Sequence, residues 1–460
     1  MKLNRSTKIA LPLLLLLSTA TIAQQITSPD PRYKADILLV IAHPDDDSLV
    51  TSYLARAVFD EHKRVAVVFC TNGDSGSNSE GREHARALGL EREIEARTAL
   101  ERLGITNIWF LNGRDTASQD VLISLASWPS ASVLEQMVRL VRLTRPEIVL
   151  TWLPSSVAGE NHGDHQAAGV IATDAFDMAG DPAAFPSQVA VPIRQFENAL
   201  EGLTPWQAQK LYFFSDAFDT TFLRGHGPEY DGNQMSQSKH ESYLQLAATS
   251  AAAYYTQMPD PSVGKQIESS GATPALVAKL QQGGFVPEPV RLWLGKSHVQ
   301  APTAGDVFDG ISPTPIPFAP PQTQEQPTAP LKVEFGGPFG FYRKFWRAHD
   351  LASLENLKPE IALQPHDTLT VPLRIQNSSA ESAQVSVSAD VPANWKLVAT
   401  IPTVSVPPHG ESRVLVQVTA PGQLNNHFAE IRLRATSAGK VLFQDSVFVQ
   451  TSGFVAGQVK

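Results

Sequence analysis

The chain has 460 residues, and 37 Lys and Arg stand against 46 Asp and Glu, which gives a formal net charge of −9. Its hydrophobic content of 42% excludes a wholly disordered chain, and its length predicts two or three domains. A single cysteine excludes an intrachain disulfide framework and metal sites built from several cysteines. The acidic balance, with no Lys/Arg tract, argues against nucleic acid as the main partner.

The N-terminus has the pattern of a secretory signal. Three basic residues precede the mostly apolar run 9–17, and the small-residue stretch 18–23 follows it. We therefore expect residues 1–23 to be a signal peptide cleaved near Ala23, and the mature protein to be secreted or periplasmic. The alternative is an uncleaved membrane anchor, but the run is shorter than the ~20 residues that a spanning helix needs. We expect no membrane span in the mature chain.

Residues 30–300 alternate between strand and helix patterns. Continuous apolar runs indicate strands buried on both faces, and stretches with helical spacing separate them. This order predicts an α/β fold with a Rossmann-like, open, mostly parallel sheet and helices on both faces. Between 181 and 310 the pattern weakens to mixed helix and loop. The expected strands are 36–42, 65–70, 107–111 and 147–152, and the expected helices are 47–62, 83–103 and 133–143.

The second half of the chain has a different texture. Seven prolines fall within the 18 residues 313–330, which predicts a stiff Pro-rich linker, placed at 301–345. Beyond it, polar and apolar residues alternate in short runs separated by turn signals. This pattern predicts an all-β, immunoglobulin-like sandwich at 346–460. The alternating runs are 368–375, 383–389, 412–418 and 427–436.

Two short motifs combine histidine with aspartate. His-Pro-Asp-Asp at 43–46 follows the first expected strand directly, and His-Gly-Asp-His at 162–165 lies in the loop after the strand 147–152. Ligands of open α/β sheets bind beyond the carboxyl ends of the strands, so we expect the two motifs to meet there. Taken singly, each has an ordinary explanation: an acidic first turn of a helix for 45–47 and a hydrogen-bonded core histidine for His43.

This residue set suits metal-assisted hydrolysis. A catalytic zinc takes three nitrogen or oxygen ligands from the protein and keeps one position for water. The metal lowers the pKa of that water from ~15.7 towards ~7, a neighbouring carboxylate can accept its proton, and a further histidine can protonate a leaving amine. The two motifs contain residues for each of these tasks.

The motifs resemble the paired signatures of the PIG-L (LmbE-like) family of zinc-dependent N-deacetylases. The resemblance continues in Arg92-x-x-Glu95, in Gly113-Arg114-Asp115, and over approximately residues 35–257. It implies that His43, Asp46 and His165 bind the metal. We expect Zn²⁺, although a His/Asp site also accepts other divalent ions.

The resemblance also implies roles around the metal. Asp45 would be the general base, and His162 would act as an acid or stabilise the oxyanion while Asp164 orients it. Arg92 and Asp115 would contact sugar hydroxyls. For Arg92 the alternative is a surface charge pair with the carboxylate three residues on, and for Asp115 an ordinary turn aspartate.

Two positions depart from the family pattern. Asp47 stands where the family usually has Glu, and the stretch beginning at Tyr254 stands where larger members often carry a His-x-Ser-Gln element. The missing histidine puts its substrate contact in doubt, but neither departure removes an expected metal ligand.

We therefore expect a secreted, metal-dependent hydrolase that removes an N-acetyl group from an N-acetylglucosamine-type sugar or glycoconjugate through a zinc-bound water. The alternatives are an amidase acting on another acylated amine or thiol conjugate, and a non-catalytic glycan-binding protein. The C-terminal part is similar to β-sandwich modules appended to secreted bacterial glycosidases, which implies a carbohydrate polymer as a further partner. Trp395 would be either a sugar platform or, more simply, a core residue of the sandwich.

Overall fold

The computed structural model describes residues 30–157, 162–190, 200–217, 219–323, 329–398, 403–422 and 428–450. The expected signal peptide therefore lies outside the described residues. Within those ranges, no helix combines the length and the apolar character that a membrane crossing requires.

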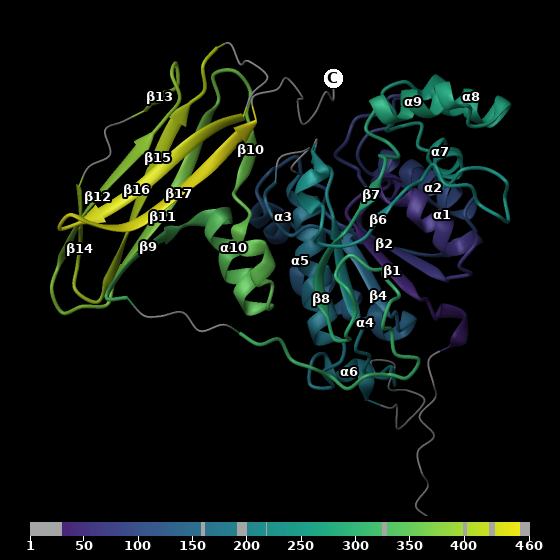
Figure 1. Cartoon of the computed structure of the whole chain (residues 1–460), viewed down its shortest axis with the longest axis horizontal. Coiled ribbons are helices and arrows are strands. Elements are labelled where there is room, and N and C mark those ends of the chain that lie inside the picture. Colours follow the sequence, from purple (N-terminus) through teal and green to yellow (C-terminus); the bar gives the residue numbers. More distant parts are fainter. Residues whose placement is uncertain are drawn as a thin grey trace, which may run out of the picture.

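A six-stranded sheet forms the centre of the first half, in the order β3-β2-β1-β4-β5-β8 (Figure 1). The first five of these strands run parallel, and β8 is antiparallel to β5. Helices cover both faces, which confirms the expected α/β architecture. The strands are β1 (Ile37–Ile41), β2 (Val65–Thr71), β3 (Asn107–Gly113), β4 (Ile148–Trp152), β5 (Lys210–Phe214) and β8 (Trp293–Ser297).

The helices α1 (Thr51–Phe59), α2 (Arg86–Glu101) and α7 (Tyr243–Ala251) lie on one face of the sheet, and α4 (Ser130–Thr144) and α5 (Gly163–Met178) lie on the other. Smaller elements complete this half. They are η1 (Pro31–Tyr33), η2 (Asp46–Leu49), α3 (Val121–Ser127), α6 (Pro186–Val189), η3 (Thr220–Leu223), β6 (Glu229–Tyr230), α8 (Pro261–Ser270), α9 (Pro274–Gln282) and β7 (Val290–Arg291).

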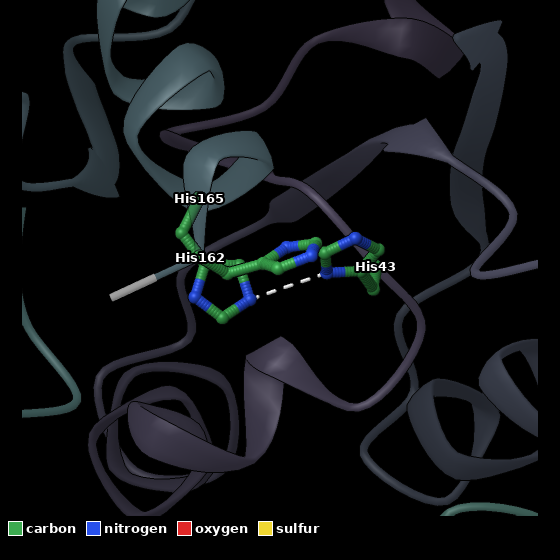
Figure 2. A group of neighbouring side chains, drawn as sticks. All are labelled: His43, His162 and His165. Atoms are coloured by element: carbon green, nitrogen blue, oxygen red, sulfur yellow. Dashed lines mark hydrogen bonds between the residues drawn. The ribbon is translucent and has the colours of Figure 1, made fainter. Parts of the chain in front are cut away.

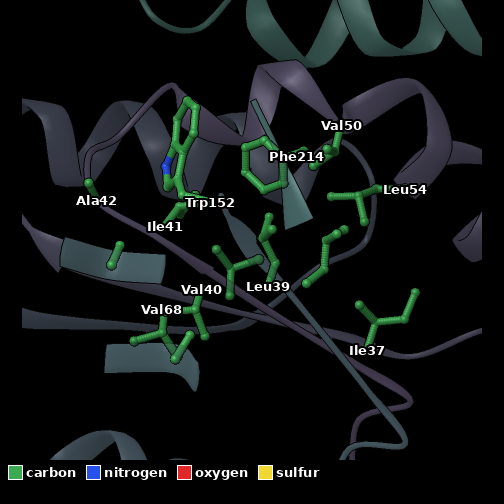
Figure 3. Packing of buried hydrophobic residues seen from close by; sticks show 14 of the residues in the cluster. Ile37, Leu39, Val40, Ile41, Ala42, Val50, Leu54, Val68, Trp152 and Phe214 are labelled. Carbon is green, nitrogen blue, oxygen red and sulfur yellow. The ribbon is translucent and has the colours of Figure 1, made fainter. Parts of the chain in front are cut away.

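The packing around β1 explains why the site is rigid. Every residue of β1 is fully buried, because the strand has neighbours on both sides and helices above and below (Figure 3). On one face α5 approaches so closely that a Cβ at Gly169 would lie 2.3 Å from the carbonyl oxygen of Trp152. Only glycine permits this contact between α5 and β4.

The strand order reverses at β1, which pairs with β2 on one side and β4 on the other. At such a switch point the loops leave towards opposite faces and open a crevice beyond the carboxyl ends of the strands. We call this edge of the sheet the carboxyl edge. Both histidine motifs lie there, one after β1 and the other at the start of α5.

Two strands of the sheet fall in the region 181–310, which the sequence predicts as mixed helix and loop. These are β5 and β8, each five residues long. Length does not distinguish them from β1 and β4, which also have five residues; the irregular segments around them conceal the signal, because a short run in such surroundings is equally compatible with a loop or a helix end.

The second half contains two sheets, in the orders β10-β17-β16-β12-β14 and β13-β15-β11-β9. They enclose a core of their own, rich in valine, leucine and isoleucine. Two facing β-sheets agree with the expected sandwich, and its immunoglobulin-like character remains a prediction. The strands are β9 (Leu331–Phe335), β10 (Glu360–Ala362), β11 (Thr368–Asn377), β12 (Ala383–Asp390), β13 (Lys396–Leu397), β14 (Thr403–Val406), β15 (Gly410–Thr419), β16 (Phe428–Ser437) and β17 (Lys440–Gln450).

The range 301–345, expected to be linker, contains regular structure. β9 pairs antiparallel with β11, and α10 (Gly337–Ala348) follows it. Figure 1 shows α10 between the two halves, with η4 (Ala352–Asn356) after it. The proline-rich composition that predicts a linker ends at Pro330, and a five-residue edge strand is too short to stand out beside it.

Candidate active site

Three hydrogen bonds fix the Asp46 carboxylate, and all of them go to the same oxygen. Its Oδ2 accepts hydrogen bonds from the backbone amides of Ala42 (2.8 Å) and His43 (2.9 Å) and from Trp152 Nε1 (2.8 Å). These three donors come from the ends of β1 and β4. They fix the carboxylate and leave its Oδ1 directed at the two histidines described next.

His43 and His165 turn one nitrogen towards each other and the other towards a carboxylate. His43 Nδ1 and His165 Nε2 are 3.2 Å apart (Figure 2). On the outer sides, His43 Nε2 lies 3.2 Å from Asp115 Oδ1, and His165 Nδ1 lies 3.4 Å from Asp216 Oδ2. A carboxylate behind a histidine favours the proton on the nitrogen that faces it, so the inner nitrogens present lone pairs to the space between them.

The inner atoms of His43, Asp46 and His165 form a small triangle. Asp46 Oδ1 is 3.2 Å from His165 Nε2 and 3.7 Å from His43 Nδ1, and the two nitrogens are 3.2 Å apart. A tetrahedral ion with ligand bonds of about 2.0–2.1 Å separates its ligands by about 3.3 Å. Donor type, spacing and burial therefore fit a divalent metal ion. Two further groupings are close enough to hold an ion: His43 with His162 and His165, and His43 with Asp115, His162 and Asp164.

His162 stands immediately before α5 and beside the triangle. Its ring centroid lies 4.9 Å from that of His43 and 5.4 Å from that of His165. Burial, with the charges of these two histidines, lowers the pKa of His162 to about 4. Its ring faces the other two in Figure 2, so an imidazole is available where a bound substrate would lie.

Asp164 makes its hydrogen bonds to the loop after β3. It is fully buried and accepts from the amide and the hydroxyl of Thr116, both at 2.8 Å, and its Oδ2 lies 3.5 Å from His43 Nε2. These bonds attach the start of α5 to the Asp115–Thr116 turn. The expected orienting effect of Asp164 on His162 remains a prediction.

Asp45 and Arg92 lie at the entrance of the sharp turn after β1. Asp45 has φ 99°, a left-handed conformation that costs a non-glycine residue about 1–3 kcal/mol and recurs at functional sites. Arg92 is 6% exposed, so it is no surface charge. It donates to the carbonyl oxygens of Gly73 (2.6 Å) and Ser77 (2.7 Å) and thereby orders the glycine-rich loop after β2.

Glu95, the carboxylate that could have paired with Arg92 on the helix surface, accepts hydrogen bonds from another residue. Glu95 accepts from the amide (2.8 Å) and hydroxyl (2.7 Å) of Thr256, and burial raises its pKa to about 7. Asp115 is also placed differently from a free turn residue: besides His43, its Oδ2 accepts from the amide of Ser75 at 2.9 Å. The sugar contacts expected for Arg92 and Asp115 remain predictions.

The two departures from the family pattern touch each other. The hydroxyl of Tyr254, just after α7, donates to Asp47 Oδ1, and both residues are almost completely buried. Thr51 Oγ1 donates to the Asp47 carbonyl oxygen at 2.6 Å. A short carboxylate and a long phenol thus span the space between the turn after β1 and the end of α7.

Three contributors are not singled out by the sequence: Trp152, Asp216 and Thr116. The ring of Trp152 stacks on that of His165 with centroids 3.9 Å apart and an interplanar angle of 5°. Trp152 ends β4 and Asp216 follows β5. A strand assigned at 210–214 would have directed attention to Asp216, because polar residues at the carboxyl edge are candidate ligands.

A pocket opens beside His162 and His165. Its wall combines aromatic and aliphatic side chains with a few polar groups, as small-ligand sites do. The lining residues are Trp152, Leu153, Ser155, Val157, His162, His165, Gln166, Phe214, Ser215 and Asp216.

Comparison with known proteins gives consistent relatives. The family profile described as "PIG-L: GlcNAc-PI de-N-acetylase" matches residues 38–176. A 1D-myo-inositol 2-acetamido-2-deoxy-alpha-D-glucopyranoside deacetylase of Streptomyces avermitilis is 27% identical over 320 aligned residues, which span 62% of this chain and 99% of that protein.

The protein of the same description from Geodermatophilus obscurus is 32% identical, but the match spans only 33% of this chain and 55% of that relative. Among solved structures, N,N'-diacetylchitobiose deacetylase from Pyrococcus horikoshii is similar with a TM-score of 0.37 and 18% identity, over 62% of this chain and 89% of that one.

Proposed function

Residues 38–176 form a domain of the PIG-L family of N-deacetylases, and from this premise we propose that the chain removes an N-acetyl group from an N-acetylglucosamine-type sugar conjugate. The observation that carries the proposal is the triangle of His43, Asp46 and His165. Each of its donors is oriented by a second group, so the site is built before any ligand arrives.

The chain's own residues divide the work. His43, Asp46 and His165 would hold the ion, which we propose to be Zn²⁺; when bound, it would supply Lewis-acid polarisation of the amide carbonyl and a water of lowered pKa. Asp45, at the strained turn beside these ligands, would accept the proton of the attacking water. His162 hydrogen-bonds the developing oxyanion or delivers a proton to the leaving amine. Asp115 and Asp216 hold the two ligand histidines in the required tautomers.

The wider setting belongs to the same proposal. The basic and apolar start of the chain supports cleavage near Ala23 and a secreted or periplasmic enzyme. The substrate class rests on the names of the relatives, which describe acetamido sugars linked to inositol. A carbohydrate polymer bound by the sandwich remains a prediction.

Metal content and acetate release test the proposal together. The mature protein is assayed with N-acetylglucosamine derivatives beside His165→Ala and a control, His409→Ala, which lies in a turn of the sandwich. We expect His165→Ala to lose both the metal and the activity, and His409→Ala to keep both. Unchanged metal and activity in His165→Ala would overturn the assignment.

A substrate panel separates the alternatives. Hydrolysis of other N-acyl amines or thiol conjugates, with no acetate from amino sugars, would identify an amidase of different specificity. Glycan binding in calorimetry with no hydrolysis of any member of the panel would identify a binding protein.

A further inference from the structure

The C-terminal half reaches the pocket beside His162 and His165 through α10 and the segment that follows it. We propose that α10 and β10 position the pocket wall of the deacetylase, so that the C-terminal half determines which acyl group the pocket accepts. This inference rests on the proposed function for its substrate. The contacts that support it are those that residues 337–362 make with the α/β half, and they do not depend on the substrate.

The first contact is made at the start of α5. The hydroxyl of Tyr342 donates to Gln166 Oε1, and Tyr342 is almost fully buried. Gln166 directly follows the ligand His165 and lines the pocket. Tyr342 therefore fixes a pocket side chain from the outer side.

The second contact is made at the loop after β4. Trp346 Nε1 donates to the carbonyl oxygen of Pro154 at 2.8 Å, and the Glu360 amide donates to the carbonyl oxygen of Ser156 at 2.8 Å. Leu153, Ser155 and Val157 of this loop line the pocket. Both acceptors are backbone atoms, so these bonds restrain the path of the loop itself.

The third contact is made at the loop after β3, which carries Asp115 and Thr116. The Gln119 amide group brackets Ala362, donating to its carbonyl oxygen and accepting from its amide nitrogen, both at 3.0 Å. One residue away, the Ser118 carbonyl oxygen accepts from the Gly163 amide at 2.6 Å. The C-terminal half thus bonds the loop that carries Asp115 and Thr116, and that loop in turn bonds the start of α5.

The end of α10 is fastened by charge. His349 lies 2.7 Å from Asp177 and 3.0 Å from Asp174, both on α5, and Lys296 of β8 pairs with Asp177. Asp177 is buried, so this contact is more than a surface ion pair. It keeps α10 aligned along α5, the helix that begins with the histidine motif.

An appended domain with no role in catalysis is not expected to form hydrogen bonds with main-chain groups of the active-site loops. Here, α10 and β10 donate hydrogen bonds to two segments that line the pocket, Gln166 and the loop 153–157, and β10 also bonds the loop after β3. A displacement of about 1 Å at a reacting centre is enough to cost ~100-fold in rate, so a loosened wall has a catalytic consequence.

Two single variants of the full chain remove one donor each: Tyr342→Phe keeps the ring packing, and Trp346→Phe also replaces the buried indole by a smaller ring. Rates are measured with N-acetyl and N-propionyl glucosamine conjugates, and amide exchange is followed over 153–157. The matched control is Tyr243→Phe on α7, which removes a part-buried hydroxyl bond to Asp60 (2.6 Å) outside the pocket.

We expect kcat/KM for the acetyl substrate to fall about 5- to 100-fold, the propionyl-to-acetyl ratio to rise severalfold, and exchange over 153–157 to accelerate in both variants. The control should keep the ratio and the exchange of the wild-type protein, even if it is equally destabilised.

Unchanged ratios and unchanged exchange in both α10 variants would overturn the inference. Equal changes in Tyr243→Phe would also overturn it, because they would reveal a general loss of stability. If the wild-type protein hydrolyses neither substrate, the proposed function fails, and the exchange measurement alone decides whether α10 positions the loop.

Discussion

The two halves of the molecule bury polar groups for different reasons. At the carboxyl edge of the α/β half, five carboxylates and imidazoles are buried together: His43, Asp46, Asp115, Asp164 and His165. In the described part of the sandwich, the buried polar side chains are Asn377 and Gln450. Asn377 donates to the carbonyl oxygens of Glu381, Val406 and Pro407, which is a structural task.

The difference teaches where function is located. Burying a charged group is costly unless a partner compensates it, so a cluster of several such groups in one place marks a candidate ligand site. The sandwich core is rich in valine, leucine and isoleucine, and its burial of apolar surface supplies stability. The carboxyl edge buries polar groups in place of apolar ones, at a cost in stability, because these groups serve chemistry. Variants at the carboxyl edge should therefore change mainly catalysis and metal binding, and variants in the sandwich core should change mainly the free energy of unfolding.

The largest effect is expected at Asp45. Asp45→Asn keeps the size of the side chain but removes its basicity, and the three ligands are untouched. We expect kcat to fall about 10²- to 10⁴-fold while the metal content stays at the wild-type level. A variant with normal kcat would assign the base to another residue, and loss of metal would show that Asp45 supports the ligands instead.

In the sandwich, Leu373→Ala should reverse this pattern. Leu373 is 1% exposed in the core, and its truncation should lower the free energy of unfolding by about 2–5 kcal/mol, with little change in metal content. Leu415→Ala is the matched control, because Leu415 is 60% exposed on β15 and should cost at most about 0.5 kcal/mol. Denaturant titration measures both; similar losses would contradict the assignment of the core.

Asp216→Asn tests the outer shell of the site. Asp216 Oδ2 lies 3.4 Å from His165 Nδ1, and we expect the loss of this carboxylate to weaken metal affinity about 10- to 100-fold and to leave the fold intact. Competition with a chelator gives the affinity. Asp219→Asn, which alters the cap of η3 on the same loop, should leave the affinity unchanged.

The smallest effect concerns the junction of the halves and depends on pH. Burial lowers the pKa of His349, but the hydrogen bonds to Asp174 and Asp177 outweigh it and raise the pKa to about 9. Because the folded state binds this proton more tightly than the unfolded state, protonated His349 stabilises the fold. The contribution is complete below about pH 6.5 and is lost as the pH rises through 9.

Unfolding curves of the wild-type protein and His349→Gln should therefore differ by about 1–3 kcal/mol at pH 6 and converge above pH 9. A constant difference across this range would show that His349 contributes through packing and not through its charge.

Much of this organisation is legible in the sequence. The continuous apolar runs of β1, β2 and β4 predict strands buried on both faces, and the alternation after residue 360 predicts two half-exposed sheets, because side-chain period reports burial directly. The His-Pro-Asp-Asp and His-Gly-Asp-His motifs lie at strand ends, and parallel strands bring such ends to one edge. The expected ligand triad follows from that rule and from the family resemblance.

Other contributors depend on contacts between distant segments. Asp216 follows a strand hidden among irregular segments, Trp152 looks like the end of a buried strand, and Asp115 looks like a turn residue until its 3.2 Å approach to His43 is known. No local pattern encodes such partners, since the hydrogen-bonded or charge-paired residues are 51 to 106 positions apart in the chain.

The sequence by itself therefore determined the two kinds of core and the ligand-bearing motifs, because periodicity and short-range spacing are local properties. Only the tertiary structure decided which groups lie against those ligands, that Tyr254 bonds Asp47, and that α10, which begins inside the expected linker, contacts the start of α5 and the loop after β4. Those decisions arise from hydrogen bonds between buried groups, whose partners are selected by packing in three dimensions and not by position along the chain.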